Sequence, residues 1–168
     1  AKNVKAEYII GIGGGSPLDA AKAVAVLATA CDMSANVLYS MEWDNEPLPV
    51  IAVGTTAGTG SEVTSVSVIT SPEGLKKSFR APSLYPRVCL GDASYTMSLP
   101  TNFTRSTALD TLSHCIEAYF NRAANDICKT FALRGISILL GMLDKTAKCD
   151  ATELSFDDRE KLYCASLY

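Results

Sequence analysis

Asp110 and His114, four positions apart, are the first candidates for chemistry in this sequence. Apolar residues recur around them at 109, 112, 116 and 119, a spacing that predicts a helix over 107–119. On a helix, side chains four apart leave the same face one turn apart. A carboxylate oxygen and an imidazole nitrogen held in this way can bind one divalent cation. The alternative is an Asp–His hydrogen bond on a helix surface. His114 is the only histidine in the chain.

A glycine-rich turn is the second candidate. Residues 7–12 are an apolar run without alternation, which is typical of a strand buried on both faces of a parallel sheet. The segment Gly13-Gly14-Gly15-Ser16-Pro17 follows it, and an Ala-rich helix is predicted over 18–29. Glycines let the backbone approach a ligand, and a helix N-terminus offers N–H groups and a positive dipole end to a phosphate. The alternative is a turn that merely connects two elements, since this is neither the G-x-G-x-x-G fingerprint nor a P-loop.

The start of that helix carries its own capping signals. Ser16 is predicted to be the N-cap, and Pro17 suits the first helical position. Asp19 then falls three residues after the cap, like an aspartate version of the capping box.

The middle of the chain predicts further strands. A second buried strand over 48–53 runs into the small, polar, glycine-punctuated segment 54–62, which would lie at the carboxyl edge of the sheet, where open α/β folds bind ligands. A strand over 63–70, turn residues at 71–74 and a returning strand over 76–81 predict a hairpin. We expect another strand over 87–91 and a surface loop over 33–49.

The last third predicts helices alone, over 104–120, 126–143 and 157–168. This change in character predicts an α/β domain built on a parallel sheet, followed by the start of an all-helical domain. We expect the boundary at residue 100, so that the two domains cover 1–100 and 101–168.

Composition excludes several classes of protein. Hydrophobic residues make up 48% and charged residues 20% of 168, which is ordinary for a folded soluble protein. The net charge is −3 and no basic block favours nucleic acid or a membrane surface. No apolar run has the length of a membrane span. The six cysteines form no C-x-x-C pair, and we expect reduced thiols in a cytoplasmic protein.

Three segments together carry a resemblance. They are Gly-Gly-Gly-Ser-Pro-Leu-Asp-Ala-Ala-Lys at 13–22, Thr-Thr-Ala-Gly-Thr-Gly-Ser-Glu at 55–62 and Ala-Leu-Asp-Thr-Leu-Ser-His-Cys-Ile-Glu-Ala-Tyr at 108–119. In this order they resemble the iron-containing (group III) alcohol dehydrogenases. The resemblance covers nearly the whole chain and implies an N-terminal α/β dinucleotide-binding domain followed by an all-helical domain. It also implies hydride transfer between NAD or NADP and a small alcohol or aldehyde, by a protein expected to be a homo-oligomer when intact.

Site residues follow from the resemblance position by position. Those implied to bind the cofactor are Gly14, Gly15 and Ser16 at the pyrophosphate, Asp19 beside the nicotinamide end, Thr55, Thr56 and Thr59 in the second segment, and Lys76 in the hairpin. Lys77 leaves a one-residue ambiguity at the last position. Asp110 and His114 match the first two metal ligands, for Fe²⁺ or alternatively Zn²⁺. No further catalytic residue is implied.

The resemblance also has departures. Gly54 stands where the family usually has proline. The family binds its metal with one Asp and three His, whereas this chain has one His. The family also has further strands upstream of the strand at 7–12, with an acidic residue that binds the adenosine ribose, and that region is absent. We therefore expect an internal fragment, starting inside the first domain and ending inside the second, that is inactive by itself. The alternatives are a nucleotide-binding module without chemistry, and an enzyme of the glycerol dehydrogenase or dehydroquinate synthase type.

Overall fold

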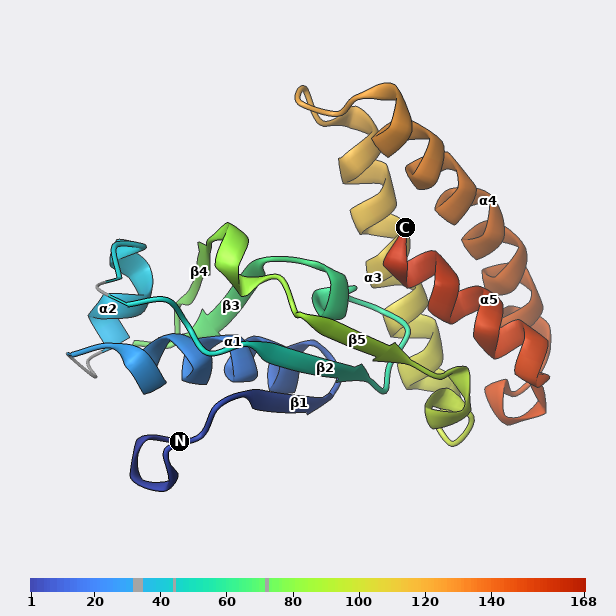
Figure 1. The fold of residues 1–168 in the computed structure, drawn as a ribbon. Coiled ribbons are helices and arrows are strands. Elements are labelled where there is room, and N and C mark those ends of the chain that lie inside the picture. Colours follow the sequence, from blue (N-terminus) through green and yellow to red (C-terminus); the bar gives the residue numbers. More distant parts are fainter. Residues whose placement is uncertain (32–34, 44, 72) are drawn as a thin grey trace. The chain divides into compact units, whose positions relative to one another are not determined.

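The computed structural model describes residues 1–31, 35–43, 45–71 and 73–168, and these form two compact units. Unit 1 comprises residues 1–54 and 61–90, and unit 2 comprises residues 55–60 and 91–168. The elements along the chain are β1 (Ile9–Gly13), α1 (Gly15–Thr29), α2 (Ala35–Ser40), β2 (Val50–Gly54), β3 (Val66–Thr70), β4 (Lys76–Arg80), β5 (Val88–Gly91), α3 (Thr101–Phe120), α4 (Asp126–Lys148) and α5 (Phe156–Leu167) (Figure 1). Mixed strands and helices followed by helices confirm the predicted fold class.

A parallel sheet with the order β1-β2-β5 is the base of unit 1. Strands β1 and β2 pair in parallel from Ile9 opposite Val50 to Gly13 opposite Gly54, and α1 is the crossover helix beside them (Figure 1). The helix packs closely on the sheet because β1 carries glycine at position 11. A Cβ atom there would lie 2.8 Å from the Cβ atom of Ala21. The β1–α1–β2 unit predicted from the apolar runs is confirmed.

The second sheet of unit 1 is the predicted hairpin. Strands β3 and β4 pair antiparallel, with Val66 opposite Arg80 and Thr70 opposite Lys76. Gly74 has φ +79° and donates its amide to the carbonyl of Ser71 at 2.9 Å, which closes the turn. Pro72 of the predicted turn lies outside the described residues.

A short helix replaces part of the surface loop predicted over 33–49. Helix α2 has only six residues, too few for a periodic pattern in the sequence. Tertiary packing stabilises it, because Leu38 is buried beside Phe79 and the indole nitrogen of Trp43 donates to the carbonyl of Val37 at 2.9 Å. Residues 32–34 and 44, which also belong to the predicted loop, lie outside the described residues.

Helix α1 begins earlier than the capping signals predict. Its N-cap is Gly14, so Ser16 and Pro17 lie inside the first turn, and the predicted cap at Ser16 is wrong. Gly13 leaves the strand with φ +146°, and the first helical hydrogen bond already closes from the amide of Leu18 to the carbonyl of Gly14. Pro17 is tolerated because amides in the first turn need no partner within the helix.

Unit 2 contains three α-helices, with α4 packed against both α3 and α5 (Figure 1). Its core includes Cys115, Leu139 and Leu162. Helix α4 continues to Lys148, five residues beyond the prediction, because Thr146 extends the buried stripe. The N-terminus of α5 is fixed by a capping box between Ser155 and Asp158.

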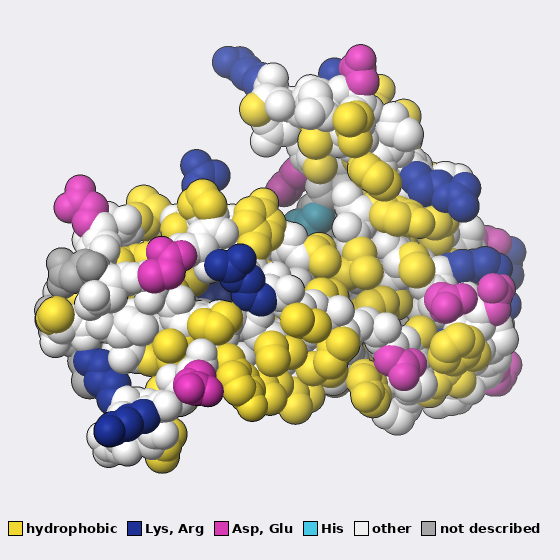
Figure 2. Space-filling model, viewed as in Figure 1, with side chains coloured by type: hydrophobic (Ala, Val, Ile, Leu, Met, Phe, Trp, Pro, Cys, Tyr) yellow, Lys and Arg dark blue, Asp and Glu magenta, His cyan; other side chains and the backbone are white. Residues whose placement is uncertain are grey.

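Three observations can be compared with the expectations from composition: the distribution of surface charge, the apolar character of the helices and the state of the cysteines. Charged side chains of both signs are interspersed on the visible face, with no large patch of one sign (Figure 2). Among the described residues, no helix combines the length and apolar character needed to cross a membrane. All six cysteines are free, and Cys31, Cys89 and Cys128 are exposed.

Candidate functional site

The glycine turn of unit 1 ends at the first amides of α1. Gly13 takes a left-handed conformation, and a Cβ atom there would lie 2.7 Å from Pro17, so this position requires glycine. Gly14 differs, because its φ of −80° is open to any residue. The amides of Gly15 and Ser16 belong to the first turn of the helix, where they have no partner within the helix and can donate to an anion. The predicted phosphate-binding residues are therefore placed at a helix N-terminus, directly after a parallel strand.

Asp19 lies one turn further along α1, and both oxygens of its carboxylate have protein partners. Oδ1 accepts from the hydroxyl of Ser61 at 2.7 Å, and Oδ2 accepts from the amide of Val68 at 3.1 Å. The side chain is 15% exposed. Asp19 therefore joins α1 to the segment that leads into β3, a role that the sequence did not predict.

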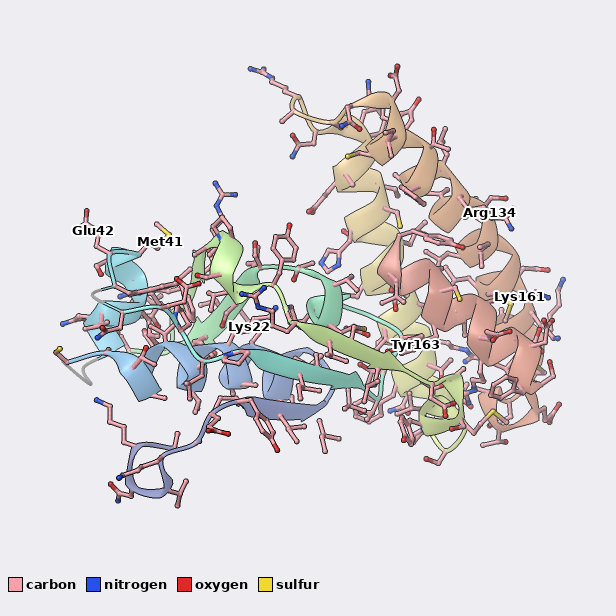
Figure 3. The ribbon with its side chains drawn as sticks, viewed as in Figure 1. Lys22, Met41, Glu42, Arg134, Lys161 and Tyr163 are labelled. Atoms are coloured by element: carbon pink, nitrogen blue, oxygen red, sulfur yellow. The ribbon has the colours of Figure 1, made fainter. Side chains whose placement is uncertain are left out.

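Lys22 is the functional candidate that sequence reasoning missed. Its side chain projects from α1 and is fully buried (Figure 3). The ammonium donates to the carbonyls of Ser61 and Val66, each at 2.7 Å, and to the Ser61 hydroxyl at 2.9 Å. One signal was available: Lys22 falls four residues after Leu18 and four before Val26, on the buried stripe of the helix.

Burial changes the acidity of this lysine. Loss of hydration disfavours the charged form and lowers the pKa of Lys22 to about 8, although the nearby carboxylates of Asp19 and Glu62 act in the opposite direction. The Lys22 ammonium lies 4.0 Å from Asp19 Oδ1. The interior of unit 1 thus contains a lysine that changes charge close to neutral pH.

The two hairpin lysines have different surroundings. Lys76 opens β4 opposite Thr70 and is exposed. The ammonium of Lys77 lies 5.2 Å from the ring centroid of Tyr39, in a cation–π contact. The geometry favours Lys76 as the lysine available to a ligand.

The threonine-rich segment belongs to unit 2, where it packs on α3. Its centre, Ala57 and Gly58, is buried, and the Gly58 carbonyl accepts from the hydroxyl of Thr111 at 2.9 Å. A Cβ atom at Gly58 would lie 3.2 Å from Thr107 Cβ, so this approach suits glycine. The three predicted threonines remain at least partly accessible: Thr55 and Thr56 are half-buried and Thr59 is exposed.

Asp110 and His114 lie on α3, one turn apart as predicted. His114 Nε2 is 3.9 Å from Asp110 Oδ1, and each side chain is 50% exposed. Within the part of the chain that the structure describes, no group of three or more His, Cys, Asp or Glu side chains could hold a metal ion. The structure therefore brings together these two metal-ligand candidates without a third.

The predicted residues divide between the units. Unit 1 holds the turn residues 14–16, Asp19 and Lys76, whereas unit 2 holds Thr55, Thr56, Thr59, Asp110 and His114. Each group can be described within its own unit, and the units supply different donors. Unit 1 supplies backbone amides and a lysine, which suit a phosphorylated ligand, and unit 2 supplies a carboxylate and an imidazole, which suit a metal.

Comparison with protein families gives two matches. Residues 1–93 match the family described as iron-containing alcohol dehydrogenase, and residues 104–168 match the C-terminal part of the Fe-containing alcohol dehydrogenase family. The two matches together leave few residues of the chain uncovered, and each falls largely within one of the two units.

Individual proteins that are similar to this chain include alcohol dehydrogenases. The chain is 41% identical to a probable alcohol dehydrogenase, EutG, of Salmonella typhimurium, over 82% of this chain and 35% of the relative. A solved iron-containing alcohol dehydrogenase is 38% identical and superimposes with a TM-score of 0.89, over 99% of this chain and 44% of that one. A sulfoacetaldehyde reductase from Bifidobacterium kashiwanohense, solved with NAD⁺, is 34% identical with a TM-score of 0.85, over 96% and 43% of the two chains. The chain thus spans less than half the length of these relatives.

Proposed function

Because the chain belongs to the iron-containing alcohol dehydrogenase family, we propose that its reaction is hydride transfer between NAD or NADP and a small alcohol or aldehyde. The observation that carries the proposal is the turn at residues 13–16. There a parallel strand leads through a left-handed glycine into a helix whose first amides have no partner within the helix, which suits a pyrophosphate. The proposal includes a homo-oligomer in the cytoplasm, where the six free thiols are stable.

In this proposal the residues of unit 1 bind and orient the cofactor. The amides of Gly15 and Ser16 donate to its phosphate oxygens, and Gly14 leaves space for their approach. The exposed ammonium of Lys76 adds a charge-assisted contact to the bound cofactor. Asp19 contributes through the protein, because both of its carboxylate oxygens already accept hydrogen bonds from Ser61 and Val68.

The metal half of the proposal rests on Asp110 and His114. Their donor atoms are 3.9 Å apart, which lets one ion reach both at the usual ligand distance of about 2.0–2.2 Å. Carboxylate oxygen and imidazole nitrogen suit Fe²⁺ and Zn²⁺ alike, so the donor chemistry fits the metal that the family's name contains. When bound, such an ion polarises the oxygen of an alcohol or carbonyl as a Lewis acid. The half-exposed side chains leave room for a ligand from solvent.

The test measures NADH affinity and NADH production in the native holoenzyme and in Gly14→Val. The added side chain fits the backbone at Gly14 but obstructs the phosphate, so we expect the dissociation constant for NADH to rise about tenfold or more. Gly141→Val is the matched control, because a Cβ atom at Gly141 meets no other atom within 4 Å. Circular dichroism checks the fold of both variants.

The outcomes separate the rival functions. Weakened binding and lost NADH production in Gly14→Val, with a normal Gly141→Val, support the dehydrogenase. Unchanged NADH affinity in Gly14→Val would reduce the turn to a connector and refute the proposal. Tight NADH binding by a holoenzyme that produces no NADH from NAD⁺ and any small alcohol would favour a nucleotide-binding module without chemistry.

A further inference from the structure

The free edge of the β3–β4 hairpin is held by two charged side chains of α1. Strand β3 pairs with β4 on one side, and on its other side it directs two backbone groups at α1. The Val66 carbonyl accepts from the Lys22 ammonium at 2.7 Å, and the Val68 amide donates to the Asp19 carboxylate at 3.1 Å. Asp19 and Lys22 thus take the place of a third strand, which would satisfy the same groups.

Charge and spacing match on the two sides of this contact. Asp19 and Lys22 are three residues apart, so they leave the same face of α1, and the two Val groups are two residues apart on β3. The negative side chain meets the N–H group, and the positive side chain meets the C=O group. A third bond, from the Ser67 hydroxyl to the Asp19 carbonyl at 2.9 Å, ties the strand to the helix backbone between them.

Ser61 connects the two charged side chains. Its hydroxyl accepts from the Lys22 ammonium at 2.9 Å and donates to Asp19 Oδ1 at 2.7 Å. The three protons of the ammonium match its three closest acceptors, the Ser61 carbonyl, the Ser61 hydroxyl and the Val66 carbonyl, while the Thr64 hydroxyl lies further away at 3.4 Å. A neutral amine has two protons, so it leaves one of these acceptors without its donor.

We propose that Lys22 is a positioning residue for the cofactor: it locks the β3–β4 hairpin, with its exposed Lys76, onto the helix that begins at the phosphate-binding turn. This inference rests on the proposed function. It assigns to Lys22, and through Ser61 to Asp19, the task of fixing two cofactor-binding elements of unit 1 at a constant separation. Lys22 itself touches no ligand, because it is fully buried.

The charge of Lys22 makes this lock sensitive to pH. The charged groups near it are Asp19 on its own helix and Glu62 on the Ser61–Val63 turn, while strands β1, β2 and β3 carry no charged or titratable side chain. As pH rises through about 8, the ammonium loses one of its three protons, and one of its three closest acceptors then receives no hydrogen bond from Lys22. NADH affinity should therefore fall over this range in the unmodified protein and stay constant in Lys22→Met.

The test uses two readouts on Lys22→Met and on the milder Ser61→Ala. The first is hydrogen exchange at the Val68 amide, which needs no cofactor, and the second is the dissociation constant for NADH between pH 7 and 9. We expect Lys22→Met to raise the exchange rate of the Val68 amide and the dissociation constant for NADH by about tenfold each. Ser61→Ala should raise each of them by less, because this variant keeps the bond from Lys22 to the Val66 carbonyl. Lys148→Met is the control, since its exposed ammonium pairs only with Asp144 on the surface of α4 in the described contacts.

Each outcome decides the inference. Increased exchange at Val68 together with weaker, pH-independent NADH binding in Lys22→Met supports it. Unchanged exchange at Val68 in both variants overturns it, whatever the cofactor does. Increased exchange with normal NADH affinity overturns it too and reduces Lys22 to a structural residue, while weakened binding in Gly14→Val leaves the proposed function standing. If the unmodified protein does not bind NADH, the proposed function itself fails, and this inference fails with it.

Discussion

Two acid–base pairs on helices, Asp19–Lys22 in α1 and Asp110–His114 in α3, have similar spacing but opposite surroundings. The Lys22 side chain is fully buried and Asp19 is 15% exposed, whereas Asp110 and His114 are each 50% exposed. The first pair is surrounded by backbone groups and a serine hydroxyl that match its charges. The second pair presents two metal-type donors to solvent, 3.9 Å apart.

The difference shows how burial assigns roles to side chains. A buried ion pair must be satisfied by the protein, because an unmatched charge in the interior costs several kcal/mol. Asp19 and Lys22 meet this requirement and so act on the fold rather than on a ligand. A half-exposed pair pays no such cost, and its donors can turn toward an ion from solvent. Position within the fold, more than residue type, thus separates positioning groups from ligand-binding groups.

The largest expected effect is on stability at alkaline pH. The pKa of Lys22 is about 8 in the folded chain and 10.5 for an ordinary lysine, so between these values the unfolded chain binds a proton that the folded chain has released. The free energy of unfolding should therefore rise with pH through this window, by up to about 3 kcal/mol. Below pH 8 Lys22 is protonated in both the folded and the unfolded chain, so it causes no change of the free energy of unfolding with pH.

This rise is measured as the difference in the free energy of unfolding between the unmodified chain and Lys22→Met, so that the contributions of other titrating groups cancel. Urea unfolding followed by the emission of Trp43, the single tryptophan, reports on unit 1. Stability and NADH affinity should move in opposite directions above pH 8. A difference that is flat from pH 7 to 10.5 would show that burial does not lower the pKa of Lys22.

A double-mutant cycle on each pair should give the next largest effect. For Asp19→Asn and Lys22→Met we expect a coupling energy of about 2 kcal/mol, because the two share Ser61 and a common strand edge. For Asp110→Asn and His114→Ala the coupling should be about 0.3–0.5 kcal/mol, as for exposed pairs one helical turn apart. Equal couplings from urea unfolding would remove the distinction between the pairs.

The two pairs were not equally visible in the sequence. The helix under Asp110 and His114 followed from apolar spacing, and their shared face followed from helical geometry, so the structure confirms their placement one turn apart. The partners of Lys22 are 39 to 44 residues away along the chain. Local patterns could place Lys22 on a buried stripe but could not identify the acceptors of its hydrogen bonds. The partners of the Asp19 carboxylate, 42 and 49 residues away, were equally beyond the reach of local patterns.

The other differences have the same origin. The sequence indicated a cap at Ser16 because hydroxyl residues are preferred there, but the left-handed turn at Gly13 starts the helix sooner. Helix α2 depends on contacts of Leu38 with Phe79, which lies far along the chain. The roles of the cofactor and metal residues remain predictions.

The metal site tests the central claim, that the exposed pair binds a metal ion and the buried pair does not. Because His114 is the only histidine, its ring protons can be followed by NMR without assignment as Zn²⁺ is added, and zinc bound by the cysteines does not confuse the signal. Two protein ligands leave the ion mostly hydrated, so we predict a saturable shift of weak affinity, above the micromolar range. The affinity should fall further in Asp110→Asn and stay unchanged in Lys22→Met. An immobile His114 signal, or one that moves equally in Asp110→Asn, would contradict the claim.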